Sequence, residues 1–185
     1  MIIRIISLKG GIGKSTISAF LAKYLSEEGS SKVLLIDKDN LNFSSFLINI
    51  LGAKVDINKE KLEGYDYIII DYPTAEEKIE SKDDDIVILV SDVVTLNLIT
   101  KYAKELKGIK LLIVNMVSPL PGDLEEVNNM VEKLDFDLKF VIPFIPKVFS
   151  MPIRKDKRTE IPAIRELAKL IKEKIKEVQV ERSFK

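Results

Sequence analysis

Six apolar runs of strand length alternate with segments of helical period along the 185 residues of this chain. The runs are nearly continuous Ile, Val and Leu, which is typical of parallel strands covered on both faces. They fall at residues 2–7, 32–37, 67–71, 86–90, 110–115 and 138–142. This alternation predicts an α/β fold, a doubly wound and mainly parallel sheet with helices on both faces and right-handed crossovers.

The segments between the runs carry apolar residues at intervals of three and four, as amphipathic helices do. These stripes lie within residues 14–25, 98–106, 124–134 and 164–178. Two polar stretches that contain proline, 118–123 and 147–160, are expected to be loops. With 46% apolar residues and no linker or repeat, the chain is expected to form a single domain over residues 1–185.

The composition excludes several kinds of chemistry. The chain has no cysteine, which excludes disulfides, iron–sulfur clusters and thiolate zinc sites, and no histidine, which removes the commonest general base. Lys plus Arg and Asp plus Glu number 29 each, so the formal net charge is zero and gives no overall attraction to nucleic acid or membrane. Because no apolar run could span a bilayer or serve as a signal peptide, the expected location is the cytoplasm.

A glycine-rich segment connects the first predicted strand to the first predicted helix, and it holds three of the chain's eight glycines. Glycines let the backbone turn tightly and aim successive N–H groups at an anion, and the helix N-terminus adds partial positive charge. In such a loop Lys14 can reach the β- and γ-phosphates of a nucleotide and Ser15 can ligate Mg²⁺. A plain strand-to-helix turn is the alternative, but it needs no Gly-Lys-Ser-Thr ending. The residues expected to bind phosphate are Gly10, Gly11, Ile12, Gly13, Lys14, Ser15 and Thr16.

Three aspartates follow buried runs, where parallel strands present their carboxyl ends to a ligand crevice. Asp37 and Asp39 end the second run, and one can bind Mg²⁺ through water while the other orients an attacking water. Asp71 ends the third run after four apolar or aromatic residues, which is a Walker B arrangement for Mg²⁺. The alternative for Asp37 and Asp39 is that they cap the turn that follows the strand.

With Lys9, the glycine-rich loop resembles the deviant Walker A motif of the ParA/MinD family of ATPases, K-G-G-x-G-K-S/T. The resemblance implies a P-loop NTPase fold, ATP and Mg²⁺ as ligands, and an ATP-dependent homodimer in which Lys9 contacts the phosphates of the partner. It also implies that Lys9 and Lys14 are catalytic and that Asp37 helps to bind Mg²⁺. Asp39 would position or polarise the attacking water.

The same resemblance places Asn115 and Pro143 beside adenine, although an Asn that satisfies local turn backbone is nearly as good a reading. Tyr72 departs from the family, which usually has a small residue after the Walker B aspartate. The family also implies a partner protein that stimulates hydrolysis. A stable membrane anchor is not expected, because the tail 179–185 is short and mostly polar.

ParA-type ATPases bind nonspecific DNA through a basic surface, and one basic segment in this chain offers such a surface. Its cations are Arg154, Lys155, Lys157 and Arg158. A solvated charged loop is the favoured reading of this segment, and an acidic run at 83–85 is likewise expected to be a solvated loop.

Three functions remain open from the sequence. The first is an ATP-dependent dimerisation switch that positions or partitions DNA or another cargo. The second is a metabolic synthetase resembling dethiobiotin synthetase or the cobyrinic acid amidating enzymes, which usually lack a lysine at the position of Lys9. The third is a nucleotide-binding regulator with negligible hydrolysis, against which Asp39 and Asp71 argue.

Overall fold

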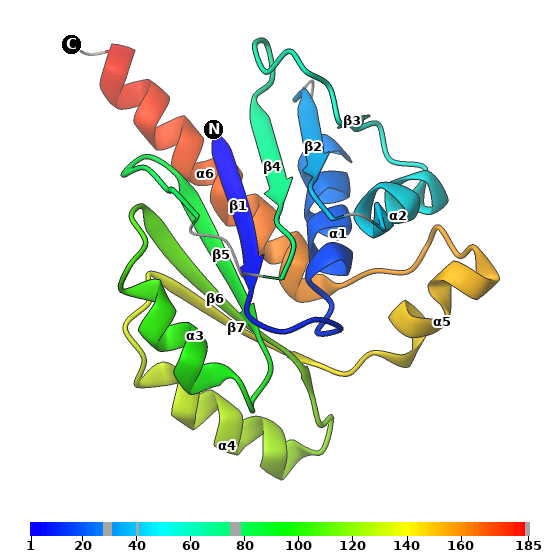
Figure 1. Cartoon of the computed structure of the whole chain (residues 1–185), viewed down its shortest axis with the longest axis vertical. Helices are drawn as coiled ribbons and strands as arrows, with labels where there is room; N and C mark the ends of the chain where they lie inside the picture. Colours follow the sequence, from blue (N-terminus) through cyan, green and yellow to red (C-terminus); the bar gives the residue numbers. More distant parts are fainter. Residues whose placement is uncertain (28–30, 40, 75–78, 184–185) are drawn as a thin grey trace.

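The computed structural model of the chain describes residues 1–27, 31–39, 41–74 and 79–183, with side chains as far as residue 174. Within these residues seven strands form one sheet in the order β3-β2-β4-β1-β5-β6-β7, and every paired strand is parallel (Figure 1). The strands are β1 (Ile2–Ser7), β2 (Val33–Asp37), β3 (Asp56–Ile57), β4 (Tyr67–Asp71), β5 (Ile86–Ser91), β6 (Ile109–Val117) and β7 (Leu138–Pro143).

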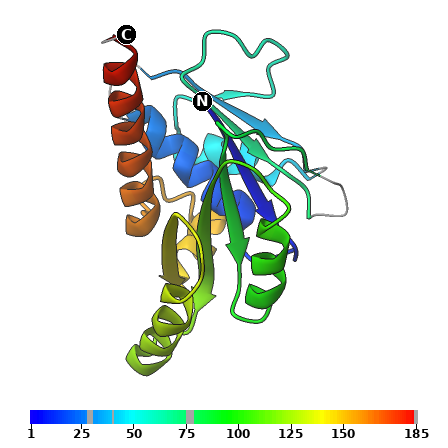
Figure 2. The same ribbon diagram turned by 90° about the vertical axis from the view of Figure 1, so that its left-hand side faces the viewer.

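Helices cover both faces of the sheet, which confirms the doubly wound α/β fold. Figure 2 shows α1 and α6 on one side of the strands and α3 on the other. Two separate apolar clusters fill the space between the layers, one under α1, α2 and α6 and one under α3 and α4. The helices are α1 (Lys14–Glu27), α2 (Phe43–Leu51), α3 (Leu96–Ala103), α4 (Pro121–Glu132), α5 (Pro146–Arg154) and α6 (Pro162–Ser183).

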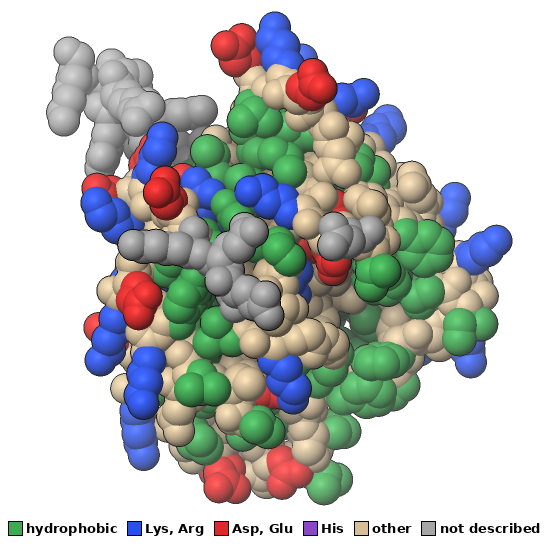
Figure 3. All heavy atoms as spheres, in the orientation of Figure 1, with side chains coloured by type: hydrophobic (Ala, Val, Ile, Leu, Met, Phe, Trp, Pro, Cys, Tyr) green, Lys and Arg blue, Asp and Glu red, His purple; other side chains and the backbone are tan. Residues whose placement is uncertain are grey.

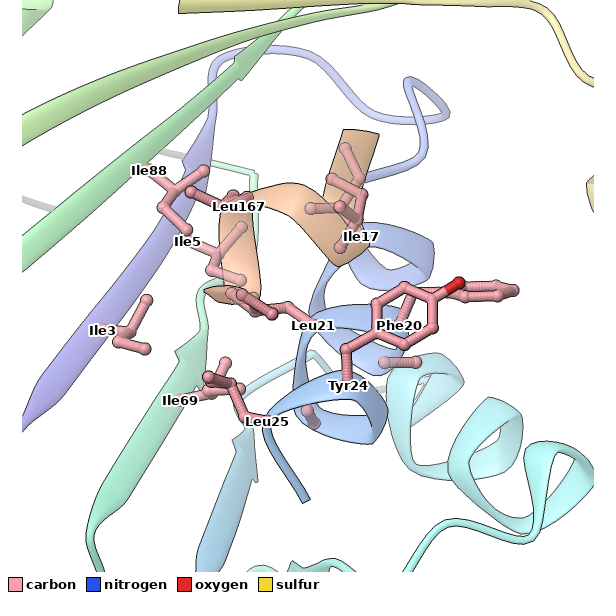
Figure 4. Close-up of a cluster of buried hydrophobic side chains, with 14 of the residues drawn as sticks. Ile3, Ile5, Ile17, Phe20, Leu21, Tyr24, Leu25, Ile69, Ile88 and Leu167 are labelled. Atoms are coloured by element: carbon pink, nitrogen blue, oxygen red, sulfur yellow. The ribbon is translucent and has the colours of Figure 1, made fainter. Parts of the chain in front are cut away.

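Helix α1 is buried almost all round, which a single apolar stripe did not predict. Every residue from Ile17 to Leu25 is buried, because α2 and α6 pack on the helix from outside while the sheet covers its inner face. Figure 4 shows Leu21 and Leu25 of α1 among Ile3, Ile5 and other side chains of the sheet. The helix that follows the glycine-rich loop is therefore fixed on several sides, which holds its N-terminus in place.

The loop prediction for 147–160 is wrong over its first half, because residues Pro146–Arg154 form α5. Pro146 begins this helix, where the missing N–H costs nothing, and Pro152 lies inside it near the end. The predicted loop at 118–123 is likewise shortened, since α4 begins at Pro121. The sequence pattern also missed α2 and the two-residue strand β3.

A buried ion pair lies between β1 and the start of β5. The Nε of Arg4 is 2.6 Å from the Oδ2 of Asp85, and its Nη1 donates to the hydroxyl of Tyr72, directly after β4. Burial alone would lower the pKa of Arg4, but Asp85 and Tyr72 raise it overall. The expectation of a solvated acidic loop is therefore wrong for Asp85, which is almost inaccessible.

Candidate functional site

The glycine-rich loop leaves the carboxyl end of β1 and runs into the first turn of α1. Gly11 and Gly13 have positive φ angles of 75° and 87°, which residues with side chains rarely adopt. A Cβ on Gly13 would lie 2.4 Å from the Nδ2 of Asn115, so this position has no room for a side chain. Ile12 between them is buried and anchors the loop to the core. The two glycines and the buried Ile12 thus fix the shape of the loop.

Lys14 and Asp71 form the most buried ion pair of the site. The Nζ of Lys14 lies 2.5 Å from the Oδ1 of Asp71, and the two side chains are 8% and 0% exposed. Burial raises the pKa of Asp71, although Lys14 and Ser15 lower it in part, and the nearby charge of Asp37 adds to the rise. The Oδ2 of Asp71 accepts no hydrogen bond from the described residues. An unpartnered buried carboxylate oxygen beside a serine hydroxyl is a donor set that suits Mg²⁺.

Asp37 lies opposite Asp71 in the register of β2 and β4, but its carboxylate is bound mainly by the first turn of α2. Its Oδ2 accepts from the hydroxyl of Ser44 at 2.6 Å and from the backbone N–H of Ser45 at 3.0 Å. Its Oδ1 accepts from the N–H of Asp39 at 3.1 Å. Asp37 therefore caps the first turn of α2, as the alternative reading of this residue expected.

One cavity of about 310 Å³ brings together most of the predicted site residues. Its polar end is formed by the glycine-rich loop and Asp39, and its apolar end by side chains of α2, α5 and the end of β7. Hydrophobic side chains also gather on the surface over α2 and α5 (Figure 3). Ile12, Asp37 and Asp71 are not among its lining residues. The predicted residues that line it are Lys9, Gly10, Gly11, Gly13, Lys14, Ser15, Thr16, Asp39, Asn115 and Pro143.

Asn115 reaches the glycine-rich loop rather than its own turn. Its Nδ2 donates to the carbonyl of Ile12 at 2.9 Å, across 103 positions of sequence. Met116, the next residue, has a φ of 60° within an irregularity of the β6–β7 pairing, and this local kink aims Asn115 at the loop. No sequence pattern indicated this contact, because it depends on the positive φ angle of Met116.

Lys9 lies at the exposed edge of the cavity and pairs with a residue that the sequence analysis did not select. Its Nζ is 2.6 Å from the Oδ2 of Asp92, which follows β5 directly. Asp92 was detectable in principle, because it comes directly after a buried strand, much as Asp71 is the last residue of one.

The basic segment does not line the cavity at the glycine-rich loop. Arg154 ends α5, and Lys155, Lys157 and Arg158 follow it, all four exposed. They line a second hollow together with Lys147 of α5. The structure thus gathers these cations on one surface.

A parallel sheet whose central strand runs into a glycine-rich, lysine-bearing loop at a helix N-terminus defines a P-loop nucleotide-binding domain. The chain belongs to the CobQ/CobB/MinD/ParA nucleotide binding domain family, which matches residues 3–177. This confirms the family that the loop motif indicated. No curated protein matches the sequence. No described helix is long and apolar enough to cross a bilayer.

Solved structures of the same fold cover nearly the whole chain. MinD cell division protein from Aquifex aeolicus is 19% identical with a TM-score of 0.66, over 92% of this chain and 95% of that one. A plasmid partition protein from Borrelia burgdorferi bound to AMPPNP is 18% identical with a TM-score of 0.63, over 95% and 98%. The ATP complex of a McdA variant from Cyanothece is 17% identical with a TM-score of 0.60, over 93% and 95%.

Proposed function

We propose that this protein is an ATP-dependent molecular switch that binds and hydrolyses Mg–ATP, dimerises with ATP, and thereby positions or partitions DNA or another cargo. The single observation that carries the proposal is the buried pair of Lys14 with Asp71, whose lysine lines the same cavity as the glycine-rich loop. The similarity to MinD, partition and McdA structures favours this switch over a metabolic synthetase.

The phosphates are proposed to bind along the backbone N–H groups of residues 10–16. Lys14 exchanges its contact with Asp71 for one with the β- and γ-phosphates, where its charge offsets the charge that develops during transfer. Adenine is proposed to lie in the apolar part of the cavity, next to Asn115 and Pro143. Asn115 uses one N–H of its Nδ2 on the loop, which leaves its Oδ1 and its second N–H for the base.

Ser15 and Asp71 are the proposed direct ligands of Mg²⁺, which when bound neutralises charge on the phosphates. Asp37 shares this region, but its hydrogen bonds to Ser44 and Ser45 limit it to an assisting role through water. Asp39 lines the cavity and is proposed to position the attacking water. Asp37 also fixes Asp39, because it accepts the backbone N–H of that residue.

Dimerisation is proposed to place Lys9 against the phosphates of the partner. Turnover of ATP tests this role directly. Lys9→Ala should abolish hydrolysis and leave nucleotide binding measurable, whereas Lys14→Ala should lose both. Unchanged turnover in Lys9→Ala would contradict the proposed dimer-dependent reaction.

Nonspecific DNA is a proposed partner of the ATP-bound form, through the exposed cations at residues 154–158. Lys155→Glu/Lys157→Glu should lower retention on DNA. The rate of ATP turnover and the extent of dimerisation should not change. Lys104→Glu/Lys107→Glu makes the same change of charge at two exposed lysines at the end of α3 and is the matched control. A protein that stimulates hydrolysis is also proposed, and MinD of Aquifex aeolicus is known in complex with MinC.

A further inference from the structure

The carboxylate of Asp92 divides its two oxygens between different partners. Its Oδ2 lies 2.6 Å from the Nζ of Lys9. Its Oδ1 accepts from the backbone N–H of Thr95 at 2.8 Å and from the hydroxyl of Thr95 at 2.7 Å. Thr95 directly precedes α3, so one carboxylate joins Lys9 to the start of that helix.

The two lysines of the glycine-rich loop are held by carboxylates on opposite sides of β1. Lys14 is paired with Asp71, at the end of β4, and Lys9 is paired with Asp92, just beyond β5. β4 and β5 are the two neighbours of β1 in the sheet. The inner pair is buried, whereas the Lys9 side chain is 49% exposed and that of Asp92 is 18% exposed. The outer pair can therefore open without any rearrangement of the core.

We propose that Asp92 is a positioning residue that holds Lys9 within its own subunit, and that Lys9 leaves Asp92 when it reaches the phosphates of a partner subunit. This inference rests on the proposed function, because it assumes the ATP-bound dimer. Asp92 thereby opposes dimerisation, and α3 is coupled to the event through Thr95. Burial of Asp92 would raise its pKa, but Lys9 and Thr95 lower it overall, so the carboxylate is charged at neutral pH and the hold is ionic.

The first variant is Asp92→Asn, which keeps an oxygen to accept from Thr95 but removes the charge that holds Lys9. With ATP, the protein concentration at half-dimerisation should fall by up to about 25-fold, because each of the two subunits opens one partly exposed ion pair and each pair contributes up to about fivefold. Light scattering over a dilution series measures it. A weaker dimer in Asp92→Asn, as in Lys9→Ala, would overturn the proposal.

Two controls separate the hold on Lys9 from the cap on α3. Thr95→Val removes the hydroxyl that donates to Asp92 but leaves the ion pair between Asp92 and Lys9 in place. Dimerisation of this variant should therefore match that of the unsubstituted protein. In a Lys9→Ala background, Asp92→Asn should not change the protein concentration at half-dimerisation. Stronger dimerisation that persists without Lys9 would show that Asp92 acts through α3 alone.

The reactivity of Lys9 tests the hold without any dimer. Acetic anhydride labelling of the nucleotide-free protein, followed by mass spectrometry, should modify Lys9 faster in Asp92→Asn and at the original rate in Thr95→Val. Equal rates in Asp92→Asn and the unsubstituted protein would overturn the inference while leaving the proposed switch intact. Faster labelling in a protein that never dimerises with ATP would instead overturn the proposed switch and with it the release step.

Discussion

The Nζ of Lys14 lies 2.5 Å from the Oδ1 of Asp71, and both side chains are buried. The cation proposed to bind phosphate is therefore neutralised by the carboxylate proposed to bind Mg²⁺. Because a buried charge without a partner is costly, each side chain stabilises the other in this arrangement.

Lys14→Met should lower the free energy of unfolding by about 3 kcal/mol, because it leaves Asp71 charged and buried without a counter-ion. Urea unfolding at neutral pH measures the loss. The loss should shrink as the pH falls, since burial already raises the pKa of Asp71 and the folded variant takes up a proton before the unfolded chain does.

The matched control is Lys14→Met/Asp71→Asn, which removes both charges together. This double variant should be more stable than Lys14→Met alone. If the two variants unfold at the same urea concentration at every pH, the ion pair does not stabilise the fold in the way we describe.

The response of nucleotide binding to Mg²⁺ should distinguish the role of Asp71 from that of the glycine-rich loop. In Asp71→Asn, the affinity for a fluorescent ATP analogue should no longer rise on addition of Mg²⁺, because the proposed metal ligand is lost. Addition of EDTA to the unsubstituted protein should reduce the affinity to the same level. A full response to Mg²⁺ in Asp71→Asn would place the metal on other residues.

Gly13→Ala should be more harmful than Gly11→Ala, although both glycines have positive φ angles. The backbone strain of about 1 kcal/mol or more is common to both changes. Only at Gly13 would the new Cβ collide with Asn115 and break its hydrogen bond to Ile12. Thermal unfolding and ATP binding should both be affected in Gly13→Ala. Equal effects at the two positions would mean that Asn115 does not brace the loop.

Tyr72→Phe should destabilise the protein by about 1.5–3 kcal/mol, because it removes a buried hydroxyl that hydrogen-bonds to the charged Arg4. Tyr65→Phe is the control, since its hydroxyl bonds to Asp56 at 2.8 Å in an exposed position. The control should lose much less in the same denaturant titration. A loss no larger than that of Tyr65→Phe would show that Arg4 is satisfied by Asp85 alone.

The sequence was sufficient for six of the seven described strands and for the position of the glycine-rich loop, because these depend on local patterns. Buried parallel strands are continuous apolar runs, and the sequence predicted β1 and β4 to the residue. Helix α5 was missed because its two prolines are typical of loops, and α2 because it begins after Asn42 in a left-handed conformation rather than after an ordinary cap.

The contacts between distant residues were beyond the sequence pattern. Asp85 was expected to be exposed to solvent, yet it forms a buried ion pair with Arg4, because β1 and β5 are neighbours in the sheet. Asp92 meets Lys9 only because the loops after the same two strands lie side by side. Each case depends on strand order, which a single sequence does not encode locally.

The most direct test of the switch is its oligomeric state by light scattering with ADP, with ATP, and with ATP in an Asp39→Ala variant. We predict a monomer with ADP, a dimer with ATP, and a longer-lived dimer in Asp39→Ala, because that variant lacks the carboxylate proposed to position the attacking water. A monomer in all three states, or a dimer that ignores the nucleotide, would contradict the switch.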